Sequence, residues 1–414
     1  MIEVHMDDVP ASYANAGVDV HAGDVMSQIW NNEGEKTYGN RTGRLGEVIV
    51  YGSGFTSTRA IDLDQIQGQF GLGLLSGVDG VGTKPEIAER ATEARRRWLS
   101  DEVEERGRDH RGISFDTTAM VTDDLARDGG EPIAIDLLFD ASSLNHEDAE
   151  AITRELAAGA VEACMAAGVI LQNGETAELG DRVGGYEGAF HYNLGGFVIG
   201  AVHRDRIITG ADVRPGQRIV AIQEDGFRAN GISLVRKVLA AQFGSQWHMT
   251  RPDLAASALT PSKIYSQAMV EMHGGYDLSR EPGAHVSAIA HITGGGIPGK
   301  LQRKLAASGH GAVLEDLFAP PPVMHDVQEW SMYHQSLAPS KNLATPDTDL
   351  YQTLNGGNGL LVVTETADEV IAIAARHGIN AKVAGEIVKD PGIELKSKGV
   401  TNFGEWIRYI PRVN

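Results

Sequence analysis

The chain has 414 residues, of which 42% are hydrophobic and 22% are charged. These values are ordinary for a globular protein and exclude disorder over the whole chain. The 56 acidic residues exceed the 36 basic ones and leave a net charge of −20, which disfavours binding to nucleic acid or to anionic lipid. We therefore expect no nucleic acid and no membrane among the partners, and phosphates only where metal ions or backbone amides reverse the field locally.

The cysteine count and the absence of an apolar leader both favour a cytoplasmic protein. Cys164 is the only cysteine, which excludes an internal disulfide and a thiolate metal cluster. The first eight residues lack the apolar core of a secretory signal. The most apolar stretch, Leu156–Leu171, is interrupted by Glu162 and is too short to span a membrane.

The elements alternate between strand and helix patterns along the chain. Short runs rich in Val, Ile or Leu predict strands at Val48–Tyr51, Leu72–Val78, Ile133–Leu138, Gly195–Val202, Arg218–Ile222 and Gly359–Val363. Apolar residues at helical spacing predict helices over Ala149–Ala167 and Ile232–Leu239, and a further helix is expected over Lys300–Leu305. The pattern predicts an α/β chain of the α+β type. A polar turn, Gly210–Gly216, suggests a boundary between domains 1–208 and 209–414.

Two segments are predicted to be surface insertions. Thr92–Arg111 is strongly charged and favours a helix with a solvated face. Ala319–Asp349 holds five prolines, and the pattern favours a long irregular loop or lid over a helix.

A glycine-rich segment, Ser76–Lys84, follows the second predicted strand. Its glycines would let the backbone approach a polyphosphate, Lys84 would supply a cation, and Asp79 could hold a divalent ion. The spacing differs from that of a Walker A loop. A tight structural turn explains the segment equally well.

Two acidic motifs strengthen the interpretation as a phosphate site. Thr122–Leu125 is predicted to open a polar turn, and Asn173–Glu178 follows the apolar run that ends at Leu171. Hard divalent cations prefer carboxylate oxygens from separate loops, so we expect Asp79, Asp124 and Glu175 to converge on one metal. For Asp123 a helix cap, and for Glu178 an exposed surface position, are equally good interpretations.

The second half supplies two glycine-rich helix starts, Asp225–Ser233 and Thr293–Gly299. Free amides at a helix N-terminus bind anions, here a sugar phosphate, although such turns also occur without a ligand. His285 and His291 are spaced poorly for a zinc pair, so a single hydrogen-bonded histidine is the simpler interpretation.

Taken together, these motifs resemble those of aminoimidazole ribonucleotide synthetase, also called phosphoribosylformylglycinamidine cyclo-ligase. The resemblance covers most of residues 13–390. It rests on Tyr13–Gly23, Ser76–Lys84, Gly174–Glu178, Asn230–Lys237, Ala288–Gly296 and Leu354–Gly359.

This resemblance implies a two-domain PurM-like fold, with an N-terminal mixed-sheet half-barrel that forms a homodimer and a C-terminal α/β sandwich. It implies ATP and Mg²⁺ as cofactors and a sugar-phosphate purine intermediate as substrate. In the family, ATP phosphorylates the formamide oxygen of formylglycinamidine ribonucleotide, and the amidine nitrogen then closes the imidazole ring.

The implied residue roles fall into four groups. The metal ligands are Asp79, Asp124 and Glu175. The ATP contacts add Gly80, Gly82, Thr83, Lys84, Asp123 and Gly174. The substrate contacts are Arg228, Ser233, Thr293, Gly294 and Gly295. The residues expected to act in catalysis are Lys84, Asp124, Asn230 and His291, the last as a proton-transfer or orienting group.

The chain departs from the family pattern at several positions. Arg228 stands where the family has a histidine, which removes a neutral proton acceptor. The family's Asn-Asp pair is Asp123-Asp124, a further acidic position falls on Asp136 or Asp140, and Gly52–Phe55 matches the N-terminal phosphate loop only loosely. Two alternatives stay open: a related ATP-dependent kinase or synthase acting on another acceptor, and a nucleotide-binding regulatory homologue without turnover.

Overall fold

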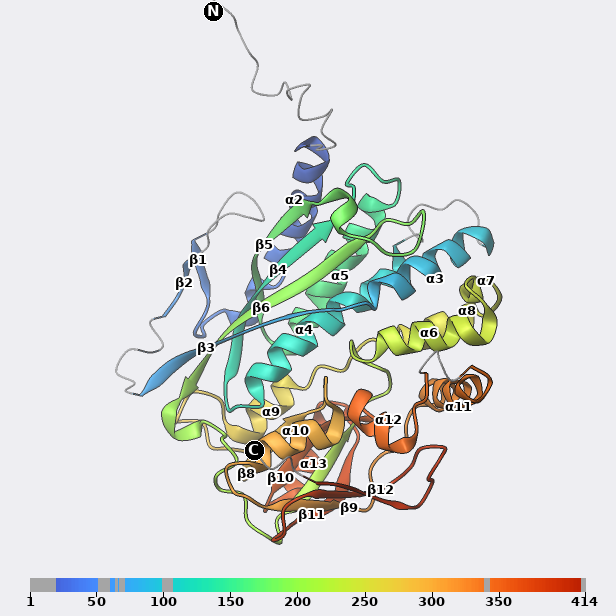
Figure 1. The fold of residues 1–414 in the computed structure, drawn as a ribbon. Coiled ribbons are helices and arrows are strands. Elements are labelled where there is room, and N and C mark those ends of the chain that lie inside the picture. The colour runs from blue at the N-terminus through green and yellow to red at the C-terminus, as the bar shows by residue number, and fades with distance from the viewer. Residues whose placement is uncertain are drawn as a thin grey trace, which may run out of the picture.

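The computed structural model describes residues 20–50, 60–63, 66, 71–98, 107–338 and 343–410. Two bodies, each built on its own sheet, are stacked on one another (Figure 1). Gly52–Phe55, most of the Tyr13–Gly23 motif and residues 99–106 of the charged segment lie outside the described residues.

The first body is a four-stranded sheet with the order β3-β6-β4-β5, in which only β4 and β5 are parallel. Its strands are β3 (Leu72–Gly80), β4 (Glu131–Ala141), β5 (Ile170–Glu178) and β6 (Tyr192–His203). Its helices are α2 (Val20–Glu35), α3 (Pro85–Trp98), α4 (Arg111–Ala126) and α5 (Ala149–Ala167). A separate short pair joins β1 (Val48–Val50) to β2 (Ala60–Ile61).

Helix α4 covers one face of this sheet, and in Figure 1 the opposite face is turned to the viewer. A methyl group at Gly196 of β6 would meet the side chains of Thr117 and Val121 of α4, so these side chains pack directly against the backbone of the sheet. Alternate residues point to the other face, which leaves apolar side chains in solvent. Leu74 is 75% exposed and Val78 is 79% exposed. Within the described part of the chain the sheet is therefore packed on one side and bare on the other.

Helix α5 has the bounds that the sequence predicts. Its apolar stripe is buried, including Ile152 and Leu156. The helix ends at Gly168, whose φ of 68° places it in the left-handed region that favours glycine. The C-cap glycine and the helical spacing explain why this element is readable from sequence alone.

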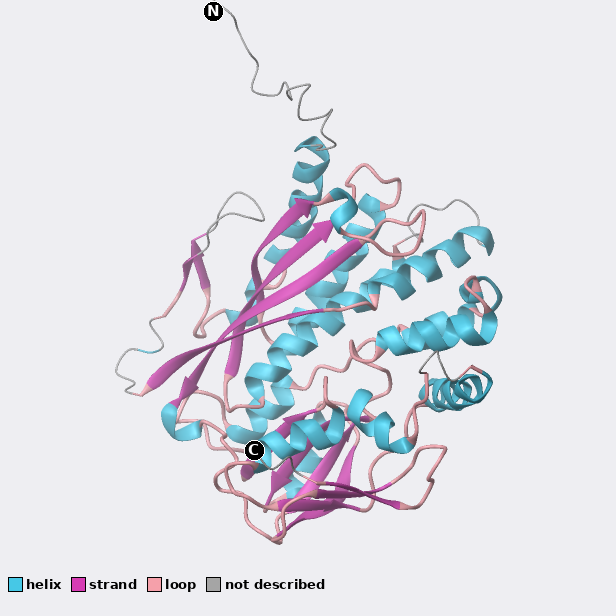
Figure 2. Cartoon of the chain, in the orientation of Figure 1, coloured by secondary structure: helices cyan, strands magenta, loops and turns pink. Residues whose placement is uncertain are grey.

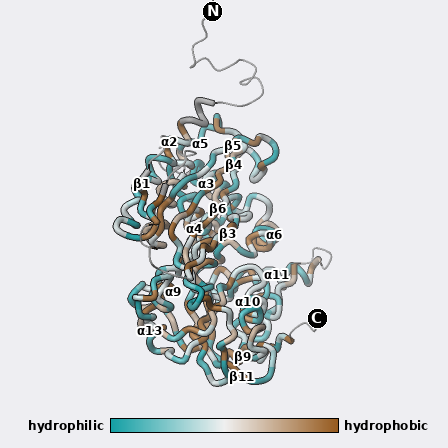
Figure 3. The backbone as a smooth tube through the Cα atoms, turned by 90° about the vertical axis from the view of Figure 1, so that its left-hand side faces the viewer, coloured by the Kyte–Doolittle hydropathy of each residue, from teal (hydrophilic) through white to brown (hydrophobic). Residues whose placement is uncertain are grey.

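The second body is a seven-stranded sheet with the order β13-β12-β9-β11-β7-β10-β8. Its strands are β7 (Arg218–Gln223), β8 (Val286–His291), β9 (Gly311–Leu314), β10 (Asn358–Thr364), β11 (Ala381–Val388), β12 (Ile393–Lys396) and β13 (Trp406–Tyr409). Its helices are α6 (Ile232–Phe243), α7 (Trp247–Thr250), α8 (Pro252–Ala258), α9 (Ser266–His273), α10 (Gly296–Leu305), α11 (Pro322–Leu337), α12 (Asp347–Thr353) and α13 (Ala367–Arg376). Figure 2 shows helices around this sheet, and Figure 3 shows the two bodies from the side.

The six predicted strands and three predicted helices are all present, with ends shifted by a few residues at most. The predictions from sequence missed β2, β5, β8, β9, β11, β12 and β13. Strand β5 was hidden because its second half, Asn173–Glu178, is polar and glycine-containing. A strand whose outer face is bare does not need an apolar run.

The prediction of an irregular loop over Ala319–Asp349 is wrong. Residues Pro322–Leu337 form α11, which packs on α6 through an edge-on contact between Trp330 and Phe243. Pro322 is the first residue of this helix and Pro321 is its N-cap. At the first helical position the missing N–H costs nothing and the fixed φ suits the first turn. The charged segment is helical as far as Trp98, as predicted.

The prediction of a polar turn at Thr122–Leu125 is also wrong. These residues form the last turn of α4, so Asp123 and Asp124 project from a helix. The alternation of Thr and Asp with apolar residues predicts a turn from the sequence. In the structure, however, α4 is buried on nearly all sides between the sheet and the second body. Tertiary contact thus overrides weak helix propensity here.

Several polar contacts join the two bodies. Glu131 of β4 accepts hydrogen bonds from Arg41 and Arg44 of the first body and from Arg280 of the second. His273 of α9 lies 3.0 Å through Nε2 from the carbonyl oxygen of Ala126, at the end of α4. Among the described residues no helix is both long and apolar enough to cross a membrane.

Candidate functional site

An acidic cluster lies where the end of α4 meets the second body. Asp123 and Asp124 come from the last turn of α4, and His291 is the last residue of β8. Arg228 comes from the loop before α6, and Tyr265 directly precedes α9. The predicted residues Asp123, Asp124, Arg228 and His291, far apart in the chain, therefore meet in one place.

His291 has both ring nitrogens engaged. Its Nδ1 lies 2.5 Å from Oδ1 of Asp124, and its Nε2 lies 2.8 Å from Nη2 of Arg228. A guanidinium can only donate, so Nε2 accepts and the ring proton is assigned to Nδ1, which donates to Asp124. Burial lowers the pKa of His291 to about 4, and the Arg228 charge adds to this effect. The ring is therefore neutral at pH 7 and holds Asp124.

Arg228 is fully buried and makes several polar contacts with its terminal nitrogens. Besides His291 it donates to Asp123 Oδ2 at 3.0 Å, to Glu224 Oε2 at 2.8 Å and to the Lys263 carbonyl oxygen at 3.1 Å. The sequence placed Arg228 on the substrate side. The structure corrects this, because a side chain with no exposed surface and all of these partners does not reach a substrate.

The two carboxylates at the end of α4 differ in environment. Burial raises the pKa of Asp123 to about 7, while Arg228 and the Tyr265 N–H, which donates at 2.8 Å, limit the rise. Asp124 is one-third exposed. Burial would raise the pKa of Asp124 as well, but the hydrogen bond from His291 and the neighbouring cations lower it to about 2. Asp124 is thus a stable, partly exposed anion where the end of α4 meets the second body.

Asp79 lies close to Asp124. By register it is opposite Gly196, on the face that α4 covers, and it is exposed at the end of β3. Burial raises the pKa of Asp79, the Gly80 N–H lowers it, and the charge of Asp124 raises it again. Lys300, in α10, is near enough for its charge to lower the pKa of both carboxylates. The sequence missed Lys300, although its place directly after the Thr293–Gly299 loop was a usable signal.

The glycine-rich loops of the two bodies touch. The hydroxyl oxygens of Thr83 and Ser233 lie 3.1 Å apart. Asn230 borders Gly294, and its buried Nδ2 has no hydrogen-bond partner among the described residues. Gly295 and Gly296 have φ values of 93° and 59°, so glycine is required where this loop turns into α10. The predicted contacts Thr83, Asn230, Ser233, Thr293, Gly294 and Gly295 thus fall in neighbouring loops.

The side chain of Lys84 is not accessible at these loops, contrary to the prediction that it contacts the phosphates of ATP. Its side chain is fully buried, and Nζ lies 2.7 Å from Asp116 Oδ2 of α4 and donates to the Thr260 carbonyl oxygen at 2.9 Å. Buried in this way, the ammonium cannot bind a phosphate. Its position joins the end of β3 to α4 and to the second body.

Glu175 and Gly174 lie elsewhere, in β5. Glu175 is opposite Leu138 of β4 and therefore points to the bare face of the sheet, whereas Asp79 points to the face under α4. A cavity of about 430 Å³ on the bare face is lined by Glu175, Asp136 and Asn173 together with apolar residues. Within one chain the sheet separates Glu175 from Asp79 and Asp124.

The expected set of three metal-binding carboxylates is therefore not assembled. Over the described ranges, no group of three or more His, Cys, Asp and Glu side chains is arranged to hold a metal ion. His285 directly precedes β8 and His291 is its last residue, so the length of the strand separates the two histidines.

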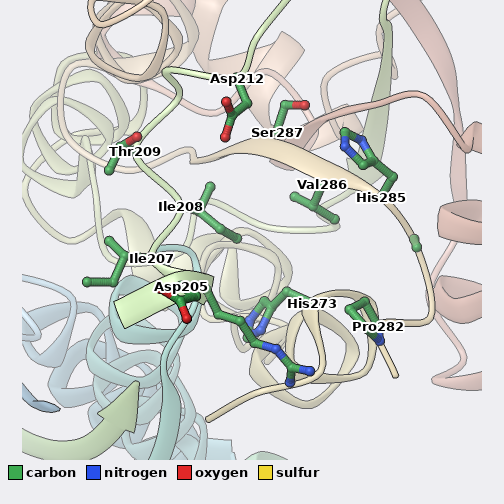
Figure 4. A pocket seen from close by; sticks show the side chains of 12 residues that line it. Asp205, Ile207, Ile208, Thr209, Asp212, His273, Pro282, His285, Val286 and Ser287 are labelled. Carbon is green, nitrogen blue, oxygen red and sulfur yellow. The ribbon is translucent and has the colours of Figure 1, made fainter. Parts of the chain in front are cut away.

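A further cavity, of about 400 Å³, lies away from this cluster (Figure 4). It is bounded by the segment from Asp205 to Asp212 and by the edge strand β8, with His285, Val286 and Ser287 along one wall. Ser287 accepts a hydrogen bond from Gln217, and His273 is committed to Ala126. This cavity contains none of the residues expected in the site.

Comparison with known proteins decides the family. Models for AIR synthase related proteins match residues 66–202 (N-terminal domain) and 214–398 (C-terminal domain). The phosphoribosylformylglycinamidine cyclo-ligase of Anaeromyxobacter sp. (strain Fw109-5) is 32% identical over 384 residues, covering 91% of this chain and 95% of that protein. The chain belongs to the phosphoribosylformylglycinamidine cyclo-ligase family. The PurM-like α/β fold implied by the motifs is thereby confirmed.

Solved structures agree on the cyclo-ligase fold. Thiamine-monophosphate kinase from Stenotrophomonas maltophilia K279a has a TM-score of 0.53 at 13% identity and covers 88% of this chain and 96% of its own. A hydrogenase maturation protein, HypE, in complex with ATP has a TM-score of 0.51 at 13% identity and covers 86% of this chain and 89% of its own. At these identities the likeness establishes the fold alone.

Proposed function

We propose that the protein catalyses ATP-dependent ring closure of formylglycinamidine ribonucleotide to aminoimidazole ribonucleotide, with release of ADP and phosphate. The observation that carries this proposal is 32% identity to a cyclo-ligase along almost the whole length of both chains. The cluster between the two bodies supports it, because it combines a stable carboxylate, a nearby second carboxylate and glycine-rich loops.

The chemistry needs the amide oxygen to become a leaving group. Phosphorylation converts this oxygen into a phosphate ester, which lowers the barrier to attack by the amidine nitrogen. Positioning and electrostatic stabilisation of the transferred phosphoryl group are then the main tasks of the protein.

Asp79 and Asp124 fit a magnesium–nucleotide complex. Mg²⁺ is commonly bound by one or two carboxylates, with phosphates and water completing its shell, so the lack of a third carboxylate is no obstacle. The hydrogen bonds that His291 and Arg127 donate to Asp124 both end on Oδ1, which leaves Oδ2 for a cation. Bound there, Mg²⁺ would neutralise charge on the transferred phosphoryl group.

The cation expected of Lys84 is instead supplied by Lys300. Lys84 is neutralised by Asp116, whereas Lys300 is partly exposed and lies near both carboxylates. On the substrate side, the unpartnered Nδ2 of Asn230 is ready to donate a hydrogen bond, and the amides of the Thr293–Gly296 loop suit a sugar phosphate. His291 acts as an orienting group, because neither of its nitrogens is available to accept a proton.

The bare sheet face supports a homodimer. Leu74, Val78 and Leu138 form an exposed apolar strip across β3 and β4, and Phe197 of β6 lies between them. A monomer gains nothing from exposing such a face, while a second copy would bury it. Dimerisation would also cover the cavity that holds Glu175 and Asp136. We further propose that the boundary between the two domains lies at residue 208 and that the protein is cytoplasmic.

Purified protein with ATP, Mg²⁺ and formylglycinamidine ribonucleotide tests the function directly. We expect an aminoimidazole product, detected by diazo coupling, in equal amount to the ADP released. ADP release without this product would favour a related enzyme with another acceptor, an alternative that Arg228 at the family's histidine position motivates. Nucleotide binding with no ADP release from any purine intermediate would favour a regulatory homologue.

A further inference from the structure

The starting observation is the backbone of Arg228. Its φ of 58° is the single positive value at a non-glycine residue in the described part of the chain. This left-handed conformation is unfavourable for an L-residue with a side chain, because Cβ comes too close to the following carbonyl oxygen. The strain is sustained by the guanidinium, which binds Glu224, Asp123, the Lys263 carbonyl and His291 and lies 5.2 Å from the centre of the Tyr265 ring.

In the hydrogen bond between Arg228 and His291, the arginine must be the donor. Because Arg228 can only donate, its hydrogen bond to Nε2 requires that this nitrogen carry no proton. The single ring proton must then sit on Nδ1, 2.5 Å from Asp124 Oδ1. A different partner at Nε2, for example a carbonyl oxygen, would reverse the tautomer and leave Asp124 facing a nitrogen lone pair.

The contact with Asp124 has a consequence for its second oxygen. His291 and Arg127 both bind Oδ1, at 2.5 Å each, so the carboxylate plane is fixed from one side. Oδ2 takes part in neither of these hydrogen bonds and belongs to a carboxylate that is one-third exposed and feels the charges of Asp79 and Lys300. The chain of contacts from Arg228 through His291 thus ends at the oxygen that the proposed function assigns to the metal.

We propose that Arg228 is a positioning residue that fixes the Nδ1–H tautomer of His291 and thereby orients Asp124 toward the cation of a metal–nucleotide complex. The proposal rests on the proposed function for the identity of that complex. It explains how the chain functions with arginine where the family has a histidine: the arginine does not replace a base but sets the hydrogen-bond direction of His291.

The test uses the full chain with ¹⁵N-labelled histidine at pH 7.5. The imidazole nitrogens of His291 are assigned by their loss in His291→Gln, and their shifts distinguish the two tautomers. We expect Nδ1–H in the unmodified protein and at least half Nε2–H in Arg228→Met. A protonated Nε2 in the unmodified protein overturns the proposal without any variant.

The second readout is the gain in ADP affinity that Mg²⁺ produces, measured by calorimetry with and without EDTA. We expect this gain to fall at least 10-fold in Arg228→Met, while metal-free ADP affinity changes less than 2-fold. Glu224→Gln is the matched control, since it removes the negative charge of the partner bound to Nη1 of Arg228, whereas His291 is bound to Nη2. It should leave the tautomer unchanged and alter the magnesium effect less than 2-fold.

Arg228→Lys serves if the methionine variant fails to fold. Lysine keeps the positive charge but lacks the planar fork that reaches Glu224, Asp123 and His291 together. An unchanged tautomer and magnesium effect in a folded Arg228 variant would overturn the proposal. If both readouts respond but no aminoimidazole forms, the positioning role stands and the proposed reaction fails.

Discussion

The contact zone between the two bodies and the bare sheet face differ in how their charged side chains are paired. In the contact zone each buried ion has an opposite charge or a hydrogen-bond donor from another element, as in Lys84 with Asp116 and Arg228 with Asp123. On the bare face Asp136 and Glu175 line a cavity beside exposed Leu138 and Phe197. In the first region the charges are paired by residues of the same chain. The second region is suited to binding by a second copy of the chain.

The lysine-to-methionine change at Lys84 should produce the largest effect on stability. Lys84→Met leaves Asp116 as an unpaired buried charge, which costs about 3–5 kcal/mol of unfolding free energy. Urea unfolding measures this loss. In the double variant Lys84→Met with Asp116→Asn, part of the stability should return.

Lys36→Met is the matched control for Lys84. Lys36 pairs with Glu33 at the surface, where its side chain is 55% exposed, so we expect a change of less than about 1 kcal/mol. Equal effects of the two substitutions would show that the Lys84 pair is not the closed contact described above.

Removal of the Asp124 charge tests the chemical side of the same zone. Asp124→Asn should lower kcat/KM for ring closure roughly 10²- to 10³-fold, comparable to the loss of one electrostatic contact to a transition state. Calorimetry should also show loss of magnesium-dependent ADP binding. Asp212→Asn, at a side chain that is 86% exposed, should have no effect on either quantity.

Acidification should weaken the contact zone through His273. Burial lowers the pKa of His273 to about 4, against about 6.5 in the unfolded chain. Between these values the unfolded state binds more protons, so stability falls as the pH drops from 6.5 to 4. One such histidine contributes at most about 1.4 kcal/mol per pH unit.

His273→Gln should therefore flatten the pH dependence of the unfolding free energy between pH 6.5 and 4. The glutamine amide can still donate to the Ala126 carbonyl, so the fold is expected to persist at neutral pH. Identical slopes for the variant and the unmodified protein would place the acid sensitivity at other groups.

The smallest effect concerns the bare face. Val78→Asp should weaken self-association roughly 10- to 100-fold, because a charge in the centre of an apolar interface loses its water. Sedimentation over a range of concentrations measures this change. Phe403→Asp, at a residue of the second body that is 72% exposed, is the control. Unchanged association of the Val78 variant would remove this face as the dimer contact.

The sequence by itself determined the mixed α/β class, the position of α5 and the strands with continuous apolar runs, because those patterns depend on local periodicity. The family motifs also marked Asp124, Asn230 and His291, since their neighbours follow a recognisable order. Local periodicity did not predict β5, because one face of that strand is bare. It did not predict α4 either, because nearly every face of that helix is buried.

Only the tertiary structure decided which charges are available to a ligand. Lys84 and Lys300 are both lysines next to glycine-rich loops, yet one is sealed against Asp116 and the other lies at the open cluster. Likewise Asp79 and Glu175 are both strand carboxylates, but register places them on opposite faces of one sheet. The reason is physical: burial and pairing depend on residues from other elements, such as Asp116 for Lys84 and Gly196 for Asp79, which no local pattern specifies.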